Sequence, residues 1–284
     1  MRVVLSRKGF DSTAGGGSSP ILADGRMVSM PIPEPVPSPG SPTYEEVEVP
    51  GRVQMTYAEL GARCGLAAAT GPMHLDPDLI PDAKERAPGW KGALGQAGSA
   101  AGHLRKQSMS IGDLFLFFGR FAHVGGRGLR GQKSFHAIFG YLQVGQMVDI
   151  GAGEQPPPWL DGHPHLTHES QTVYKRHNMV FLARHRLDFA PDCPGWGVFH
   201  YDDALRMTPN DCDGLVWWEL PDCFGPEAGA TVSYLPASCW HPPEARRVRV
   251  EVIGNKQELV CKGNDAIAFW AKELVATSRR WSPF

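Results

Sequence analysis

Two stretches of sequence, SIGDLFLFFG at residues 110–119 and FHAIFGYLQVG at residues 135–145, decide the fold of this chain. Residues 114–118 are an unbroken apolar run with three phenylalanines, preceded by glycine and aspartate and followed by glycine. A short apolar run enclosed by turn-forming residues is typical of a strand that is buried on both faces. Residues 137–144 are similarly apolar, so we expect the two runs to be neighbouring strands joined by a glycine-rich, basic loop.

The composition predicts an ordered protein with many loops. The chain has 284 residues, of which 42% are hydrophobic, so it can bury a substantial core. The 33 glycines and 25 prolines exceed average usage and indicate short elements with frequent turns. We expect one domain over residues 1–284, which includes an extended, proline-rich surface excursion over residues 31–51.

Three helices can be predicted outside the central strands. Thr56, with a glutamate three residues later, has the pattern of a helix cap. Residues 94–107 have apolar side chains at helical spacing, and residues 266–277 repeat that pattern after a cap at Asn264 or Asp265. With the short strands between them, these helices predict an α+β fold: a mostly antiparallel, strongly bent β-sheet or barrel with a few packed helices.

The charge pattern limits the classes of partner. A formal net charge of −2 gives no general attraction to polyanions, which argues against tight nonspecific binding to nucleic acid. One segment differs, because six basic residues between positions 105 and 133 face only one acid, Asp113. The basic residues are Arg105, Lys106, Arg120, Arg127, Arg130 and Lys133. They form either a solvated loop or a rim that faces an anion.

The cysteines and the hydropathy pattern indicate a reducing, aqueous environment. The six cysteines form neither a C-x-x-C motif nor a tight cluster, so we expect free thiols. The first residues become charged after three apolar positions, and no apolar segment is long enough to span a membrane. We therefore expect a soluble, cytoplasmic protein with no membrane partner.

The first loop, SRKGFDS at residues 6–12, has two cations, an acid and two hydroxyls directly after a buried strand. Arg7 and Lys8 could hold a phosphate or a carboxylate at such a strand end. The alternative is an ordinary charged turn in which Asp11 caps backbone amides.

Two clusters contain residue types that bind metals or transfer protons. His74, Asp76 and Asp78 alternate, so in an extended loop they project to one side. His163 and His165 flank a proline and could supply two imidazoles to a divalent metal such as iron or zinc. The alternatives are a turn that is stabilised by its own carboxylates and hydrogen-bonded surface histidines.

Other candidate residues are aromatic or isolated. His136 precedes the second central strand, where it could point into a barrel mouth or serve as a structural histidine. Trp218 could stack on a planar base, although a core position is the simpler interpretation. The sequence contains no phosphate-binding loop, dinucleotide fingerprint, H-E-x-x-H motif or G-x-S-x-G motif, which excludes the commonest enzyme classes.

Eight segments in this order resemble a known family. They are SRKGFDS (6–12), SPI (19–21), DG (24–25), HLDPDL (74–79), GDLFLFFG (112–119), GYLQVG (140–145), HPHL (163–166) and WELP (218–221). The chain resembles the nucleotide modification associated domain 3 (Nmad3) family of bacteria and phages. The chain departs from the family pattern before Trp218 and before Gln257, where the family has more basic residues; this implies a less charged ligand if those positions touch a phosphate.

The resemblance implies roles for particular residues. The catalytic candidates are Asp11, His74, Asp76 and His136. The ligand-binding candidates from the resemblance are Arg7, Lys8 and Ser12. We add Trp218, which could stack on a base, and Gln257. The metal-ligand candidates are His74, Asp78, His163 and His165.

Three functions remain open at this point. The resemblance implies a protein that handles a nucleotide or a modified base, with catalysis by His/Asp acid–base or metal chemistry left open. The alternatives are a metal-dependent enzyme acting on a small metabolite and a noncatalytic reader of modified bases in DNA or RNA. The partner is a nucleotide or nucleic-acid base in the first interpretation, and neither the substrate nor the oligomeric state follows from the sequence.

Overall fold

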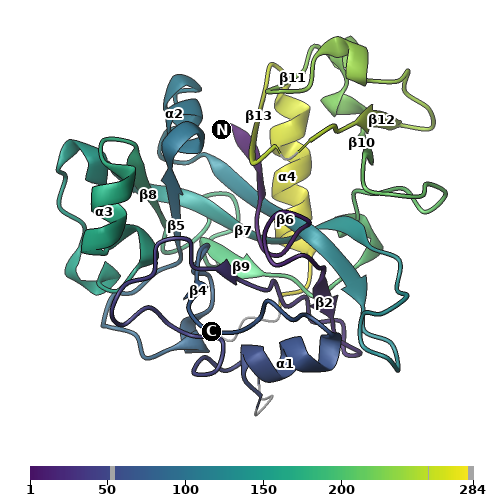
Figure 1. Ribbon diagram of the computed structural model, residues 1–284. Coiled ribbons are helices and arrows are strands. Elements are labelled where there is room, and N and C mark those ends of the chain that lie inside the picture. Colours follow the sequence, from purple (N-terminus) through teal and green to yellow (C-terminus); the bar gives the residue numbers. More distant parts are fainter. Residues whose placement is uncertain (52–54, 255, 281–284) are drawn as a thin grey trace.

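A mixed β-sheet forms the centre of the computed structural model, which describes residues 1–51, 55–254 and 256–280 (Figure 1). Its main path has the order β11-β13-β1-β6-β7-β8-β5, with β2 paired to β6 and β9 paired to β7. The strands are β1 (Val3–Arg7), β2 (Ser19–Ile21), β5 (Ala93–Ala97), β6 (Leu114–His123), β7 (Phe135–Val148), β8 (Asn178–Ala183), β9 (Trp196–Val198), β11 (Thr231–Val232) and β13 (Glu258–Lys262).

The apolar stretches at residues 110–119 and 135–145 contribute the central pair of strands, β6 and β7. They pair antiparallel from Leu114 opposite Gln143 to Phe121 opposite Phe135, with a bulge between Phe117 and Phe118. Residues 114–118 are fully buried, because other strands or helices cover both faces of the sheet at this point. The prediction of a buried strand pair is therefore confirmed.

The sheet is open within the described residues. β1 and β2 run parallel to β6, and the other pairings of this sheet are antiparallel. The described strands β5 and β11 lie at its two ends, and each pairs on one side only. The α+β class is confirmed, whereas the barrel alternative is not, because nothing in the described chain joins the two end strands.

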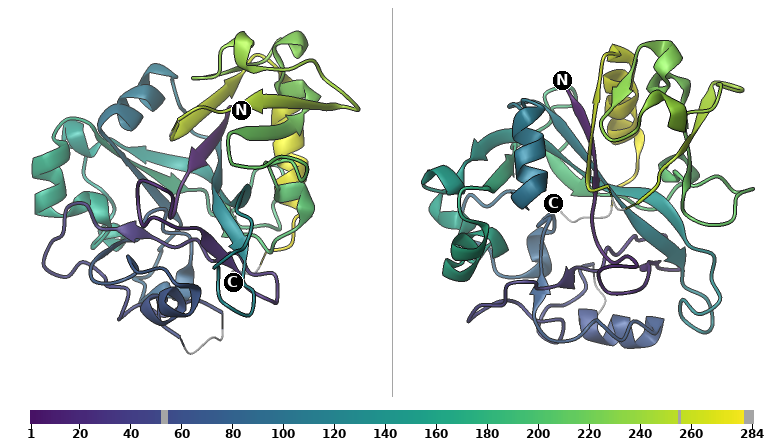
Figure 2. Two further views of the ribbon diagram at one scale, coloured as in Figure 1. Left: turned by 45° about the vertical axis from the view of Figure 1, so that its right-hand side comes forward. Right: turned by 45° about the horizontal axis from the view of Figure 1, so that its top comes forward.

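Within the described residues, two small sheets and four α-helices surround the central sheet (Figure 2). The small sheets pair β3 (Ile32–Pro33) with β4 (Met73–His74) and β10 (Trp217–Pro221) with β12 (Arg247–Glu251). The α-helices are α1 (Tyr57–Cys64), α2 (Gly98–Lys106), α3 (His168–Tyr174) and α4 (Asp265–Thr277). Figures 1 and 2 place α2 and α3 on one side of β6 and β7 and α4 on the other. None of the helices in the described residues combines the length and apolar character needed to cross a membrane.

The predicted helix caps are confirmed, and one predicted helix is partly wrong. Thr56 and Glu59 form a reciprocal capping box at α1, and the Asn264 side chain caps α4. Residues 94–97, the start of the helix predicted over 94–107, belong to strand β5 instead, and the helix α2 begins only at Gly98. They pair antiparallel with β8, so tertiary pairing overrides the local helical spacing, and Gly98 at φ +55° begins the helix that follows.

The proline-rich segment over residues 31–51 also contributes to the interior. It contains β3 and buries Tyr44, Val47 and Val49 in a second hydrophobic cluster with residues of α1. The Tyr44 hydroxyl donates a hydrogen bond to the Pro31 carbonyl. The segment predicted as a surface excursion thus packs against the body of the protein and carries Glu34 inward.

Candidate functional site

Segments that are far apart in the sequence meet at one cavity of about 250 Å³. The loop after β1, the end of β4, strand β5, the start of β13 and the segment from His165 to α3 all contribute to it. The lining residues with polar or aromatic side chains are Arg7, Lys8, Asp11, Thr13, His74, Asp76, Gln96, His165, Tyr174 and Gln257. Most of the residues predicted for ligand binding and catalysis therefore share one concavity.

Close packing against β6 positions the first loop at the cavity. The Lys8 amide donates to the Phe118 carbonyl at 2.8 Å, which extends the pairing of β1 with β6. A Cβ at position 119 would lie 2.7 Å from the Lys8 carbonyl oxygen, so this approach requires Gly119. Arg7 and Lys8 are held at the point where β1 ends.

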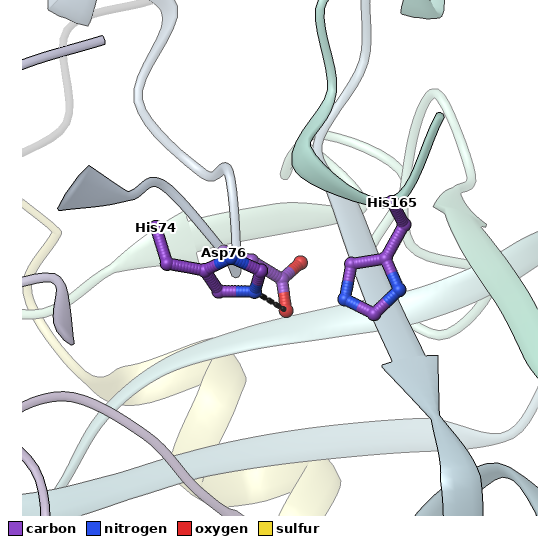
Figure 3. Close-up of side chains that lie close together, drawn as sticks. All are labelled: His74, Asp76 and His165. Atoms are coloured by element: carbon purple, nitrogen blue, oxygen red, sulfur yellow. Dashed lines mark ion pairs between the residues drawn. The ribbon is translucent and has the colours of Figure 1, made fainter. Parts of the chain in front are cut away.

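His74 is oriented by a buried carboxylate that the sequence did not reveal. Its Nδ1 lies 2.9 Å from Oε2 of Glu34. A carboxylate at this distance keeps the imidazole proton on Nδ1, which leaves the lone pair on Nε2. Nε2 lies 4.0 Å from Oδ2 of Asp76, as Figure 3 shows.

His165 is oriented in the same way by an amide. Its Nδ1 lies 2.8 Å from Oδ1 of Asn178, and the Asn178 Nδ2 donates to the His165 carbonyl at 2.7 Å, which fixes the orientation of the amide. Nδ1 therefore carries the proton, and the Nε2 lone pair is free. Burial lowers the pKa of His165 to about 3, so the ring is neutral at pH 7. Tyr174 stacks on the ring at a centroid distance of 5.2 Å.

Asp76 is an ionised carboxylate between the two imidazoles. The Gly95 amide donates to its Oδ1 at 2.6 Å, and Nε2 of His163 lies 3.4 Å from the same oxygen. Burial raises the pKa of Asp76, but its interactions with His163, His165 and His74 outweigh burial and hold that pKa well below its usual range. The other oxygen, Oδ2, is the one that lies nearer to His74.

His74, Asp76 and His165 form a donor set suited to a divalent transition metal. One ligand atom from each lies within 4.8 Å of the others, and Figure 3 shows the carboxylate between the two rings. Two imidazole nitrogens and one carboxylate oxygen are the ligands of mononuclear non-haem iron sites and of many zinc sites. The hydrogen bonds to both Nδ1 atoms support this fit, because they direct both Nε2 lone pairs inward.

The cations on the other side of the cavity are paired with acids. Nη2 of Arg7 lies 3.1 Å from Oδ2 of Asp11, and Nζ of Lys8 lies 3.1 Å from Oε1 of Glu258. Gln96 also donates to that Glu258 oxygen, at 2.6 Å. Burial raises the pKa of Glu258 despite the charge of Lys8. These contacts hold the cationic side chains in place beside the donor set.

Asp11 has a structural contact as well. Its Oδ1 accepts hydrogen bonds from the amides of Thr13 and Ala14, as the capping interpretation of this loop expects. Ser12 is exposed and does not line the cavity, whereas Thr13 does. The loop thus presents Arg7, Lys8 and Thr13 to a ligand, and Asp11 orients Arg7.

Besides Ser12 and His163, the candidates Asp78, His136 and Trp218 do not line the cavity. Both Asp78 carboxylate oxygens accept hydrogen bonds from Arg86 at 2.6 Å, so they are not directed toward the histidines. The Trp218 indole donates to Nδ1 of His136 at 2.9 Å, and both rings are buried beside Phe118. Burial lowers the pKa of His136 to about 3. Trp218 therefore occupies the core position that was the simpler interpretation.

Sequence reasoning missed Glu34, Asn178, Gly95 and Tyr174. Glu34 lies between two prolines in a segment without periodicity. Gly95 and Asn178 come close together only because β5 pairs with β8. A Cβ at position 95 would lie 2.1 Å from Cδ2 of His165, so glycine is required for the ring to occupy its place. The requirement for glycine at position 95 follows from this contact, which no local sequence pattern indicates.

The fold and the site define an α+β protein with a His/Asp donor set facing cationic side chains. The family described as nucleotide modification associated domain 3 (Nmad3) matches residues 2–262, which include every cavity residue named above. The chain belongs to this family, as the ordered motifs predict. No curated protein and no solved structure shows a significant match. The description of the family links the chain to nucleotide modification.

Proposed function

We propose that this protein binds a nucleotide in the cavity and modifies its base with a divalent metal held by His74, Asp76 and His165. The observation that carries the proposal is the convergence of Arg7 and Lys8 with these three side chains on one cavity. The volume of about 250 Å³ is close to the lower end of the ~300–1,000 Å³ typical of sites for small molecules and cofactors.

The chemistry of each side chain suggests its role in the cavity. Arg7 and Lys8 face an anionic group such as a phosphate, since cationic donors form the stronger, charge-assisted hydrogen bonds. The amides of Gln96 and Gln257 can donate and accept hydrogen bonds at the edge of a base. A bound metal would supply Lewis-acid activation or an activated water at neutral pH. Glu34, Asn178 and His163 keep the donor set in position.

Two observations change the metal ligands proposed from the sequence. His163 approaches the Asp76 oxygen opposite the one nearer to His74, and its Nδ1 accepts a hydrogen bond from the His165 amide at 3.3 Å. His163 therefore orients the carboxylate. Asp78 is held by Arg86. The proposed ligands are His74, Asp76 and His165.

Metal analysis and calorimetry test the proposal. Protein purified without chelator should contain iron or zinc close to one ion per chain, and Co(II) should bind with visible absorption bands. Calorimetry with a panel of 5′-mononucleotides should give saturable heat, which Arg7→Gln should abolish and Lys106→Gln, exposed at the far end of α2, should leave unchanged. Absence of metal and of heat with every nucleotide would refute the proposal.

A small metabolite remains the main rival substrate, because the same donor set could serve it. A metal-loaded protein that ignores all mononucleotides, but whose melting temperature rises with a non-nucleotide phosphate or carboxylate compound, would assign the cavity to that compound class.

A further inference from the structure

A second cavity, a groove of about 600 Å³, carries an unusual concentration of positive charge. Four arginines line it, and its described lining contains no acidic residue: Arg63, Arg120, Arg127 and Arg130, with Gly17, Ser18, Gln132 and Ser134 among the others. Arg63, Arg127 and Arg130 are exposed. We call this cavity the arginine groove.

The charge of the arginine groove is not balanced by ion pairs with the described residues. Within the described part of the chain, none of its four arginines has an ion pair with a carboxylate. Elsewhere, arginines such as Arg2, Arg86 and Arg249 are paired with acids. Unpaired cations gathered in one concavity attract an anionic partner, even on a protein whose net charge is −2.

Tight packing builds the groove between α1 and the loop that joins β6 to β7. Gly128, at φ +67°, lies so close to the end of α1 that a Cβ would be 2.4 Å from the Arg63 carbonyl oxygen. The Arg120 guanidinium donates to Oγ of Ser134 at 3.3 Å, and Ser134 also shares a hydrogen bond with Ser18. The positions of these arginines therefore follow from fixed elements of the fold.

The arginine groove and the nucleotide cavity are neighbours. One loop separates them, because Asp11 and Thr13 line the cavity while Gly17 and Ser18 line the groove. Arg7 pairs with Phe118 across β1 and β6, and Arg120 follows two positions later on the same face of β6. Burial lowers the pKa of Arg7, and the nearby charge of Arg120 lowers it further against the effect of Asp11. Cationic side chains thus continue from the cavity into the groove.

We infer that the arginine groove binds the sugar–phosphate backbone of a single nucleic-acid strand whose target nucleotide enters the cavity. This inference rests on the proposed function and names its substrate class. A free nucleotide needs only the cations of the cavity, whereas a strand carries further phosphates beside the target residue. Enzymes that modify a base act on single strands or on extruded nucleotides, and cationic grooves that track the backbone are typical of single-strand binding.

Fluorescence anisotropy with a labelled single strand of mixed sequence tests this inference. A strand of about 12 nucleotides is within the site sizes of known single-strand binding folds. DNA and RNA strands of the same sequence are both titrated at several salt concentrations. The test variant is Arg127→Gln/Arg130→Gln, and the control is Arg105→Gln/Lys106→Gln, which removes the same charge at the end of α2. Melting temperatures confirm that both variants are folded.

The full chain should bind at least one of the strands more tightly than a mononucleotide, with a logarithmic salt slope of about −0.7 per phosphate contacted. Arg127→Gln/Arg130→Gln should weaken strand binding about tenfold or more, reduce the slope by about 1.4, and leave mononucleotide binding unchanged. The control should match the parent protein. The inference would be overturned if the arginine substitutions left strand binding unaffected, or if strands bound no more tightly than a mononucleotide. The proposed function is tested separately, by the effect of Arg7→Gln on mononucleotide binding.

Discussion

Two regions of the protein each bury a histidine whose pKa is lowered to about 3, but the groups that surround the two imidazole rings differ. His165 lies at the cavity, with its Nδ1 bonded to Asn178 and its Nε2 close to His74 and Asp76. His136 lies in the core, with its Nδ1 accepting from Trp218 and its ring packed beside Phe118. Burial and a shifted pKa are shared, so they do not identify a functional histidine by themselves.

The difference comes from which atoms converge. At the cavity, residues from separate parts of the chain bring three ligand atoms within 4.8 Å of one another. At His136 the neighbours are aromatic rings, which supply packing and one indole donor. The comparison teaches that the hydrogen bonds made by Nδ1 and the groups that face Nε2 distinguish a site from a structural histidine. Four predictions test this distinction, beginning with the largest expected effect.

Removal of a proposed ligand should have the largest effect. His165→Ala should reduce affinity for Co(II) by well over the ~100-fold seen when supporting residues around metals are changed. His136→Gln should leave Co(II) affinity unchanged. Titration of chelator-treated protein, followed by visible absorption, measures both. Equal losses in the two variants would mean that the comparison is wrong.

Gly95→Ala should act on the same ring without removing it. The added Cβ would lie 2.1 Å from His165 Cδ2, so the ring must move, and the strain should cost about 1–3 kcal/mol of stability. Co(II) affinity should fall at least tenfold. The matched control is Gly102→Ala in α2, where an added Cβ meets nothing within 4 Å. This substitution should stabilise the helix by up to about 1 kcal/mol. Unaltered metal binding in Gly95→Ala would contradict the proposed place of His165 in the site.

Glu34 variants separate orientation from charge. Glu34→Ala should lower metal affinity by about 10–100-fold, because His74 loses the partner that keeps its proton on Nδ1. Glu34→Gln retains an oxygen acceptor and should have a smaller effect. Calorimetric titration with Zn(II) provides the comparison. If the two variants are equally impaired, the negative charge of Glu34, and not its hydrogen bond, supports His74.

The last prediction concerns His136 and the pH dependence of stability, with no effect on metal affinity expected. Because its pKa is about 3 in the folded chain and 6.5 in the reference state, the unfolded chain takes up a proton first as the pH falls below 6.5. Stability should therefore be complete above pH 6.5 and decline by up to about 1.4 kcal/mol per pH unit between 6.5 and 3. His136→Gln should flatten this decline, measured by urea unfolding from pH 7 to 5. An unchanged slope would show that His136 is not kept neutral by the core.

The sequence by itself determined the local features of this protein. The apolar runs at 114–118 and 137–144 identified the central strands, since an unbroken apolar segment must be covered on both faces. Thr56 and Asn264 marked helix starts because capping depends on neighbouring residues only. The same local information predicted Lys8 and Asp76 in loops beside strands, where ligand-binding side chains gather. In the structure Arg7 and His74 are the last residues of β1 and β4, and Lys8 and Asp76 lie just beyond those strands.

Only the tertiary structure decided which of these side chains meet. It turned residues 93–97 into a strand, brought Glu34 and Asn178 to the two histidines, paired Asp78 with Arg86 and enclosed His136 with Trp218. Each of these outcomes depends on contacts between residues that are distant in sequence or on competition for one partner. Local periodicity and composition carry no information about such contacts, because the free energy that selects them comes from packing the whole sheet and its covering elements.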